Sequence, residues 1–384
     1  MNPTSDLYDE LAAAAAQNAP GEVAALLASA PAVLLYGAGG MGRSVLRLLR
    51  ARGVAVRAFL DRSARPGDER DGVPVLPPDA PEFGPEARQD TPVLLTVFNY
   101  QVDEAALRAD LGRLGWSTLV PFTRLHRDFA AALGDQYWLT DPKFYADRAA
   151  EMRAASQLWA DERSRAIYDA VLRRRCRGEE SPALSPDVDS AYFPADVPPW
   201  KAPARFVDCG AYEGDTLEDI RARRFPLAAV AAFEPDPGHL PQLAGTLRGL
   251  VDAAEADSAL LWPCAVHSCT TSLRFAAGLG TSSGVSAEGN VVVPAVALDD
   301  VLSGFNPTLI KMDIEGAEPD ALLGARETIR RHRPGLAVCT YHRPDHLWQI
   351  PLLIQGWNLG YRFWLRLHAH SGYEMVLYAQ AEAA

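Results

Sequence analysis

Acidic and glycine residues alternate along the stretch RFVDCGAYEGDT, residues 205–216. Its apolar beginning predicts a buried strand, and Gly210 and Gly214 would let the chain turn sharply and a ligand approach the backbone. The acids of the turn would repel the pyrophosphate of a dinucleotide and attract the sulfonium and ammonium groups of S-adenosylmethionine. The same acids would also cap and solvate an ordinary strand–helix turn, so this stretch alone is a weak argument for a methyl donor.

The elements that follow predict how such a cofactor would be held. Asp215 and Thr216 come directly before a predicted helix, residues 217–224, and both residue types favour helix N-caps. The N-terminus of that helix would face the anionic end of the ligand. A second apolar strand, residues 229–236, carries Glu234 at its end, and an acid in that position suits ribose hydroxyls.

Histidines near the later strands are candidates for the base that a hydroxyl acceptor needs. Methyl transfer is an in-line displacement, and an alcohol must also lose its proton to a group such as histidine. His342 follows a predicted fifth strand, residues 337–341, at the strand end where ligands bind in open α/β sheets, and is the predicted base. His346 and His368 are predicted to face the substrate, although core packing or a surface hairpin would explain them equally well.

A second glycine motif lies near the N-terminus. The stretch AVLLYGAGGMG, residues 32–42, predicts a strand and a G-x-G-x-x-G turn, followed by a helix over residues 43–52, and Asp61 ends the next predicted strand. On Gly37, Gly39, Gly42 and Asp61 an NAD-dependent oxidoreductase is an open alternative. Few further strands are predicted after them, which leaves room for about one mononucleotide half. A nucleotide or nucleotide-sugar site, or a domain that only packs, is therefore expected.

Length and composition limit the partners. At 384 residues and 48% hydrophobic content, the chain should form about two globular domains. A net charge of -12 argues against nucleic acid or an anionic membrane surface as the partner. The five cysteines show no CxxC pair and no zinc-like spacing with histidine, and neither a basic leader nor an apolar run of membrane-spanning length is visible. These features predict a cytoplasmic protein with reduced cysteines, and a homodimer is left open.

Several separated motifs of the second half resemble one family. FVDCGAYEGDT, AFEPDP, VPAVALDDVL and IKMDIEGAEPDALLGA occur in this order and are similar to the FkbM family of S-adenosylmethionine-dependent methyltransferases, over about residues 161–379. The resemblance implies an α/β fold of the class I methyltransferase type, with a mainly parallel sheet and an antiparallel C-terminal strand. It usually implies O-methylation of a sugar or a small natural product. Residues 32–122 resemble the Rossmann-like accessory domain of certain sugar-modifying enzymes.

The resemblance also implies roles for single residues. Asp313, at the end of a predicted strand over residues 308–313, would lie beside the reacting methyl group, although a helix cap is the alternative. The methionine part would contact the turn after the first strand, the ribose Glu234, and the adenine Ala265 and its neighbours. The expected cofactor contacts are Asp208, Gly210, Ala211, Gly214, Thr216, Glu234, Pro235, Ala265 and Asp313. With His342, Asp313 is the predicted catalytic residue, and Glu315 joins the predicted substrate residues.

A divalent cation among Asp313, Glu315 and His342 would lower the pKa of the substrate hydroxyl. Nothing in the spacing demands one, so metal-independent transfer is expected. Glu315 and Glu318 are equally open to a structural role, Glu318 through an arginine partner. The predicted organisation is a Rossmann-like accessory domain at residues 1–123, a solvated helical linker at 124–203 and the methyltransferase domain at 204–384. A protein that binds nucleotides without chemistry is a further alternative.

Overall fold

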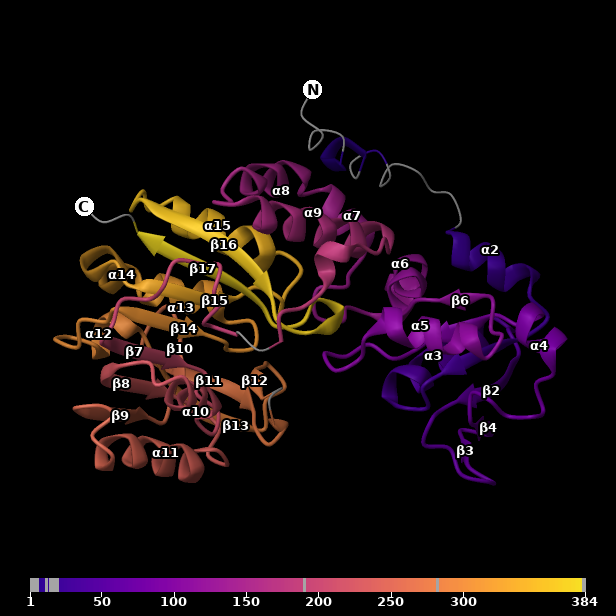
Figure 1. The fold of residues 1–384 in the computed structure, drawn as a ribbon, viewed down its shortest axis with the longest axis horizontal. Coiled ribbons are helices and arrows are strands. Elements are labelled where there is room, and N and C mark those ends of the chain that lie inside the picture. The colour runs from indigo at the N-terminus through magenta and orange to yellow at the C-terminus, as the bar shows by residue number, and fades with distance from the viewer. Residues whose placement is uncertain (1–6, 11–12, 14–20, 189–190, 281–282, 382–384) are drawn as a thin grey trace. The chain divides into compact units, whose positions relative to one another are not determined.

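The chain folds into two α/β units, each built around its own sheet (Figure 1). A computed structural model describes residues 7–10, 13, 21–188, 191–280 and 283–381. The first unit contains Met1–Arg153, Ala166–Pro186 and Ala369–Tyr373, and the second contains Ala154–Arg165, Asp187–His368 and Glu374–Ala384. The chain therefore alternates between the units, and their limits do not coincide with the predicted boundaries at residues 123 and 203. Leu11, which the helical spacing near the N-terminus includes, lies outside the described residues.

The sheet of the first unit is larger than the sequence predicts. Its order is β3-β4-β2-β1-β5-β6. All of these strands run parallel except β3 at the edge, which is antiparallel to β4. The strands are β1 (Val33–Tyr36), β2 (Val56–Leu60), β3 (Glu69–Arg70), β4 (Val73–Leu76), β5 (Val93–Leu95) and β6 (Leu119–Val120). The prediction of about one mononucleotide half was wrong. Strands of two to four residues are too short to show a period in the sequence.

Helices accompany this sheet and contribute to the core of the first unit. They are α2 (Glu22–Ser29), α3 (Gly40–Ala51), α4 (Pro85–Asp90), α5 (Glu104–Arg113), α6 (Phe122–Leu133), α7 (Pro142–Ala146), α8 (Ala149–Ser156) and α9 (Glu162–Arg177), of which α8 and α9 run across a unit limit. The segment from α6 to α9 was predicted to be a solvated linker, and this was wrong. Its large side chains, such as Trp138, Tyr145 and Tyr168, are buried. Its many charged residues conceal these apolar positions in the sequence.

The second unit has a seven-stranded sheet with the order β16-β17-β15-β14-β7-β8-β9. Its strands are β7 (Ala204–Cys209), β8 (Leu227–Phe233), β9 (Ser258–Trp262), β14 (Leu309–Met312), β15 (Gly335–Cys339), β16 (Tyr361–Leu367) and β17 (Met375–Ala381). β17 is antiparallel to both of its neighbours, β15 and β16, and the other pairs of adjacent strands are parallel. The predicted mainly parallel sheet with an antiparallel C-terminal strand is confirmed.

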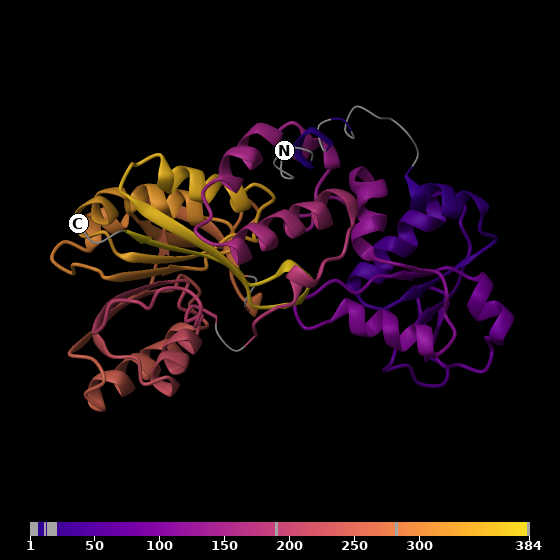
Figure 2. The ribbon, with the colours of Figure 1, turned by 45° about the horizontal axis from the view of Figure 1, so that its top comes forward.

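Helices lie on both faces of this sheet. They are α10 (Asp215–Ala222), α11 (Leu240–Asp252), α13 (Glu318–Gly324), α14 (Arg326–His332) and α15 (His346–Gln355). Figures 1 and 2 show α11 on one side and α13 to α15 on the other. The chain runs outward from β7 through β8 to β9 and from β14 through β15 in the opposite direction. Right-handed crossovers therefore place the two groups of helices on opposite faces.

A smaller sheet is inserted between β9 and β14. Its order is β10-β13-β11-β12, with β10 (Ala265–Val266), β11 (Thr271–Ala276), β12 (Gly284–Val285) and β13 (Val291–Val296), followed by the short helix α12 (Leu298–Val301). Ala265, Phe275, Val293 and Ala295 form its core. The sequence predicts one strand over residues 259–266, but the strand ends at Trp262. Pro263 cannot donate a ladder hydrogen bond, and Ala265 begins the second sheet.

A buried arginine ties the beginning of the second unit to its C-terminal strands. Arg366 in β16 is 1% exposed, and its guanidinium lies 2.7 Å from Asp161 and 2.9 Å from Asp196. Burial alone would raise the pKa of Asp161, but the hydrogen bonds from Arg366 and Ser164 outweigh it and lower that pKa below its usual value of 3.8. The pKa of Asp196 is lowered in the same way, chiefly by Arg366.

These two shifts predict acid lability. A carboxyl whose folded-state pKa is depressed contributes stability above its unfolded pKa, and that stability is lost as the pH falls through the folded pKa. We expect the free energy of unfolding to fall below about pH 4, and the double variant Asp161→Asn/Asp196→Asn to show a shallower fall. Urea titrations between about pH 6 and pH 3 measure this slope. Asp257→Asn removes an exposed carboxylate and is the control; an unchanged slope in the double variant would contradict the assignment.

Candidate active site

The strands at the centre of the second unit end together at one edge of the sheet. Lys311 of β14 pairs in register with Asp208 of β7, which pairs with Ala232 of β8. The residues that follow these strands, Asp313, Gly210 and Glu234, are therefore neighbours at the edge where open α/β sheets bind ligands. The predicted positions of these three residues at the ends of adjacent strands are thus observed.

Both glycines of the first turn are required by the fold itself. Gly210 has φ +79°, and a β-carbon there would collide with the carbonyl oxygen of Asp313. Gly214 has φ +94°, and a β-carbon there would lie 2.8 Å from Cγ2 of Thr246. Gly214 is also the N-cap of α10, without a side-chain cap, so the predicted capping by Asp215 or Thr216 was wrong by one residue. The turn is tight because the chain packs against itself.

A buried ion pair supports this turn from below. Nζ of Lys311 lies 3.1 Å from Oδ1 of Asp208 and donates a hydrogen bond of 2.6 Å to the carbonyl oxygen of Gly210. Burial raises the pKa of Asp208 to about 6 even though Lys311 opposes it. The Asp208 carboxylate is 0% exposed and lies against Lys311. The sequence analysis missed Lys311, although a lysine in the apolar strand TLIKM was the available signal.

Glu234 is held by the backbone of the same edge. Its Oε2 accepts a 2.9 Å hydrogen bond from the amide of Tyr212, and its Oε1 accepts one of 2.8 Å from Asp236. Burial raises the pKa of Glu234, and the two amides oppose that shift. A carboxylate offers about four lone-pair directions. Nδ1 of His239 also lies 3.4 Å from Oε1, so the capacity for a further hydroxyl donor is at Oε2, which among the described residues accepts only from the Tyr212 amide. The other predicted cofactor residues lie around it: Ala211, Thr216 and Ala265 are buried, and Pro235 is half-buried.

Asp236 connects this edge to the inserted sheet and was missed from sequence. Its Oδ2 accepts hydrogen bonds of 2.8 Å from the Gly278 amide and 2.9 Å from the Ser283 hydroxyl. Its Oδ1 accepts one of 3.0 Å from the Gly238 amide. The loop before β12 is thereby fixed to the end of β8. Gly278 and Ser283 lie more than forty residues away from Asp236 in the chain, and no local pattern reveals these two contacts.

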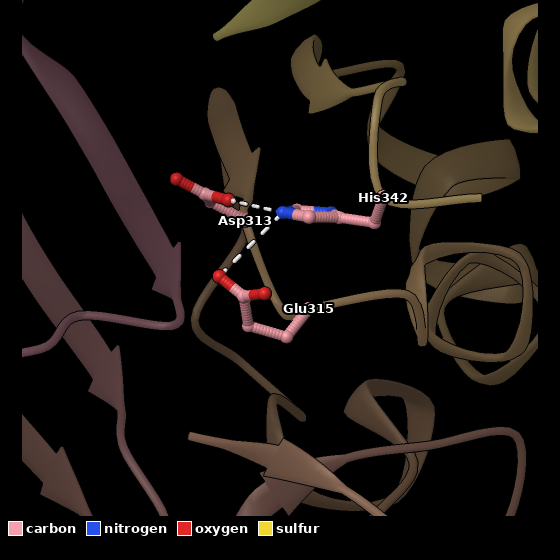
Figure 3. A group of neighbouring side chains, drawn as sticks. All are labelled: Asp313, Glu315 and His342. Carbon is pink, nitrogen blue, oxygen red and sulfur yellow. Dashed lines mark ion pairs between the residues drawn. The ribbon is translucent and has the colours of Figure 1, made fainter. Parts of the chain in front are cut away.

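Asp313, Glu315 and His342 converge beyond the ends of β14 and β15 (Figure 3). Nε2 of His342 lies 3.3 Å from Oδ1 of Asp313 and 3.6 Å from Oε1 of Glu315. The imidazole is 2% exposed, whereas the Asp313 and Glu315 side chains are 22% and 26% exposed. We call these three residues the acid–histidine cluster. It combines a predicted catalytic pair with one of the predicted substrate residues.

Glu318 orients the histidine from behind. Its Oε1 lies 2.8 Å from Nδ1 of His342 and accepts a 2.9 Å hydrogen bond from the Ile314 amide. Its Oε2 lies 3.2 Å from Nδ1 of His346. The predicted arginine partner of Glu318 was wrong, because the carboxylate is fully buried between these two histidines. His346, which was predicted to face the substrate, thus contacts one oxygen of the Glu318 carboxylate, while His342 contacts the other.

The carboxylates decide the protonation of His342. Burial alone would lower its pKa, but Glu318, Asp313 and Glu315 outweigh burial and raise that pKa well above its usual value. Burial raises the pKa of Glu315 to about 7, against the opposing charge of His342. The prediction that His342 acts as a base near neutral pH relies on the ordinary pKa of histidine, which these carboxylates shift upward.

Tyr192 connects the cluster to the segment before β7. The Tyr192 hydroxyl donates a 2.9 Å hydrogen bond to Oδ2 of Asp313, and the sequence analysis did not assign it this role. His368 was predicted to face the substrate, but its ring nitrogens lie 2.7 Å from the Asp187 carbonyl and 2.6 Å from the Tyr378 hydroxyl. These contacts, in a buried side chain, explain His368 without a substrate.

The glycine motif of the first unit and the acid Asp61 are engaged in contacts within their own turn and loops. A β-carbon at Gly42 would collide with the carbonyl oxygen of Gly37, so this glycine lets α3 pack on the turn. Asp61 follows β2 as predicted, but its Oδ2 accepts a 3.1 Å hydrogen bond from the Ala38 amide. Its Oδ1 accepts from the Ser63 amide at 2.9 Å and the Ser63 hydroxyl at 2.7 Å. The acid that a dinucleotide ribose would need is thus engaged by its own loops.

The strand order and the acids at the strand ends define a Rossmann-like domain of the class I methyltransferase type. Comparison with known proteins identifies the domain further. Residues 208–363 match the methyltransferase FkbM domain. The predicted resemblance to this family is confirmed over these residues.

A solved structure shows the same fold over almost the whole chain. It is the methyltransferase FkbM from Methylobacillus flagellatus KT, which is 24% identical, with a TM-score of 0.78 over 98% of this chain and 99% of that one. A search of curated proteins gave no match. Among the described residues, no helix combines the length and the apolar character needed to cross a membrane.

Proposed function

We propose that the second unit uses S-adenosylmethionine to methylate a hydroxyl group of a sugar, a glycosylated intermediate or another small natural product. The observation that carries the proposal is the placement of Glu234 and the acid–histidine cluster at one edge of the sheet, in a methyltransferase domain. In this proposal Glu234 accepts the ribose hydroxyls, and the cluster receives the acceptor. The partner is a small molecule rather than a nucleic acid or a membrane, and a cytoplasmic location is part of the proposal.

The chemistry needs alignment and loss of a proton. The acceptor oxygen attacks the methyl carbon in line with the sulfonium, and the carbon–sulfur bond breaks toward sulfur. The cluster would hold the hydroxyl and lower the cost of its deprotonation, since its carboxylates can accept hydrogen bonds from a polyhydroxylated acceptor. We assign hydroxyl activation to the cluster as a whole and not to His342 as a free base.

The alternatives receive less support. An NAD-dependent oxidoreductase would need Asp61 for the ribose, and its carboxylate is engaged by Ala38 and Ser63. It would also leave the methyltransferase domain without a role. A protein that only binds nucleotides would bind S-adenosylmethionine without transferring its methyl group. A nucleotide or nucleotide-sugar ligand of the first unit remains part of the proposal. Gly39 is the residue to change in a test of that ligand, because a β-carbon there would meet no atom of the described residues within 4 Å.

Calorimetric titration with S-adenosylmethionine and, separately, with NAD tests the proposal. We expect Glu234→Ala to weaken S-adenosylmethionine binding about 10- to 100-fold, because hydrogen bonds from the ribose to a charged group are lost. Asp252→Asn, an exposed carboxylate of α11, is the matched control. Gly39→Val should leave this binding unchanged. If NAD binds instead, and Gly39→Val abolishes that binding, the first unit carries the chemistry and the proposal is wrong.

A further inference from the structure

The acid–histidine cluster has the donors and the spacing of a divalent-cation site. We propose that Asp313, Glu315 and His342 ligate a divalent cation, and that Glu318 and Tyr192 orient two of these ligands. The role of the cation in catalysis rests on the function proposed above, whereas its binding does not. This inference replaces the expectation of metal-independent transfer.

The distances fit ligands of one ion. One donor atom from each residue lies within 4.8 Å of the others, and two of the separations are 3.3 and 3.6 Å. Ligands about 2.1 Å from a common cation are separated by about 3.0 Å at octahedral angles and by about 3.4 Å at tetrahedral angles. Figure 3 shows Nε2 of His342 pointing between the two carboxylates. Little movement is needed to close the three donors around an ion.

Unsatisfied polar atoms point to the same place. Within the described part of the chain, neither Nε2 of His342 nor Oδ1 of Asp313 has a hydrogen-bond partner, although they lie 3.3 Å apart. The imidazole is 2% exposed, so bulk water does not solvate this nitrogen freely. Buried polar atoms in native proteins are nearly all satisfied. A hydrogen bond between these two atoms would need the N–H to point at the oxygen. A cation between them needs only that both atoms face the cation, which agrees with their short separation and missing hydrogen bond.

The surrounding residues have the arrangement that supports metal ligands. A ligating histidine usually donates its second ring N–H to a carboxylate, and Nδ1 of His342 lies 2.8 Å from buried Glu318. The Tyr192 hydroxyl donates to Oδ2 of Asp313 and leaves Oδ1 facing the cluster. A β-carbon at Gly284 in β12 would lie 3.0 Å from Cβ of Glu315, so the inserted sheet limits where this side chain can move. Each of the three ligands is thus restrained from outside.

The chemistry of the donors indicates the kind of ion. Two carboxylates and one imidazole would bring a divalent ion close to neutrality, and Mn²⁺ suits carboxylate ligands and tolerates imidazole. The hydroxyl of the acceptor would complete the coordination and release its proton to solvent. Its oxygen would then form the bond to the methyl carbon as the carbon–sulfur bond breaks. The products are a methyl ether and the neutral thioether of the cofactor.

Titration of the full chain with Mn²⁺ alone, followed by the EPR signal of the free ion, tests the site. We expect one equivalent to bind without cofactor or acceptor. Glu315→Gln should weaken binding more than 100-fold, and Glu318→Gln about 10- to 100-fold, as for residues that orient a ligand. Asp320→Asn changes an exposed acid of the same helix as Glu318 and should bind as the unmodified chain does. His342→Ala should also lose binding, with folding checked by circular dichroism.

The outcomes separate the two proposals. No binding of Mn²⁺, or binding that Glu315→Gln and Glu318→Gln leave unchanged, would overturn the cation site and leave the S-adenosylmethionine titration to decide the function. Mn²⁺ binding that depends on Glu315 and Glu318, in a chain that does not bind S-adenosylmethionine, would support the cation site and remove the proposed function. Equal loss in Asp320→Asn would show nonspecific attraction to acidic residues and count against the site.

Discussion

Replacement of His342 by alanine should lower turnover about 100-fold or more while affinity for S-adenosylmethionine is unchanged. The imidazole lies between the carboxylates of Asp313 and Glu315. Apart from Asp313, the predicted cofactor residues belong to β7, the turn after it, α10, the end of β8 and β10. Loss of the imidazole removes the central residue of the acid–histidine cluster, to which we assign hydroxyl activation. Release of S-adenosylhomocysteine, with an acceptor found in a panel of sugars and hydroxylated natural products, measures the effect.

The control for this variant is a histidine of the same unit outside the cluster. His332 ends α14 and is half-buried, so His332→Ala should retain turnover. Near-normal turnover in His342→Ala would exclude the imidazole from the reaction. A parallel loss of S-adenosylmethionine affinity would instead show that the variant disturbs the whole edge of the sheet, and that the assignment to acceptor activation is wrong.

Replacement of Lys311 by methionine should destabilise the second unit by about 3–5 kcal/mol. The side chain is 3% exposed and its partner Asp208 is 0% exposed, so the variant leaves a buried carboxylate without its counter-charge. It also removes the hydrogen bond to the carbonyl oxygen of Gly210. Urea denaturation, followed by fluorescence and circular dichroism, measures the change.

A double variant distinguishes the ion pair from simple packing. Asp208→Asn in the Lys311→Met background removes the stranded charge, and we expect it to recover part of the lost stability. Lys201→Met, an exposed lysine of the same unit, should change stability little. If Lys311→Met were as stable as the unmodified chain, Asp208 would not depend on Lys311, and the support for the turn would lie elsewhere.

Strands with long apolar runs could be predicted from sequence, and short or interrupted ones could not. β8 is a continuous apolar segment and β14 is apolar apart from Lys311, and their end acids, Glu234 and Asp313, are where the pattern places them. β6 has two residues and carries no period at all. The apolar run over residues 259–266 was predicted as one strand because Pro263 lies inside it, and that proline separates β9 from β10. The buried helices before β7 were mistaken for a linker because charged residues are interspersed among their apolar ones.

Contacts between distant residues account for what was missed at the site. Asp313, Glu315 and His342 follow predicted strands, so their meeting could be anticipated once the strands were taken as neighbours. Tyr192 reaches Asp313 across 121 positions of the chain, and no local rule connects the two. The two histidine partners of Glu318 were likewise invisible, since their helix and loop are brought together only by the fold.

Because the chain alternates between its two units, neither unit is encoded by one uninterrupted segment of the gene. A gene segment that begins at Ala204 encodes every strand of the larger sheet. It would nevertheless lack Asp161 and Asp196, which neutralise the buried Arg366, and Tyr192, which holds Asp313. A segment that begins at Ala154 would contain the whole second unit, but it would also carry residues 166–186 and 369–373, which belong to the first unit. The second unit therefore cannot be transferred complete without removing part of the first.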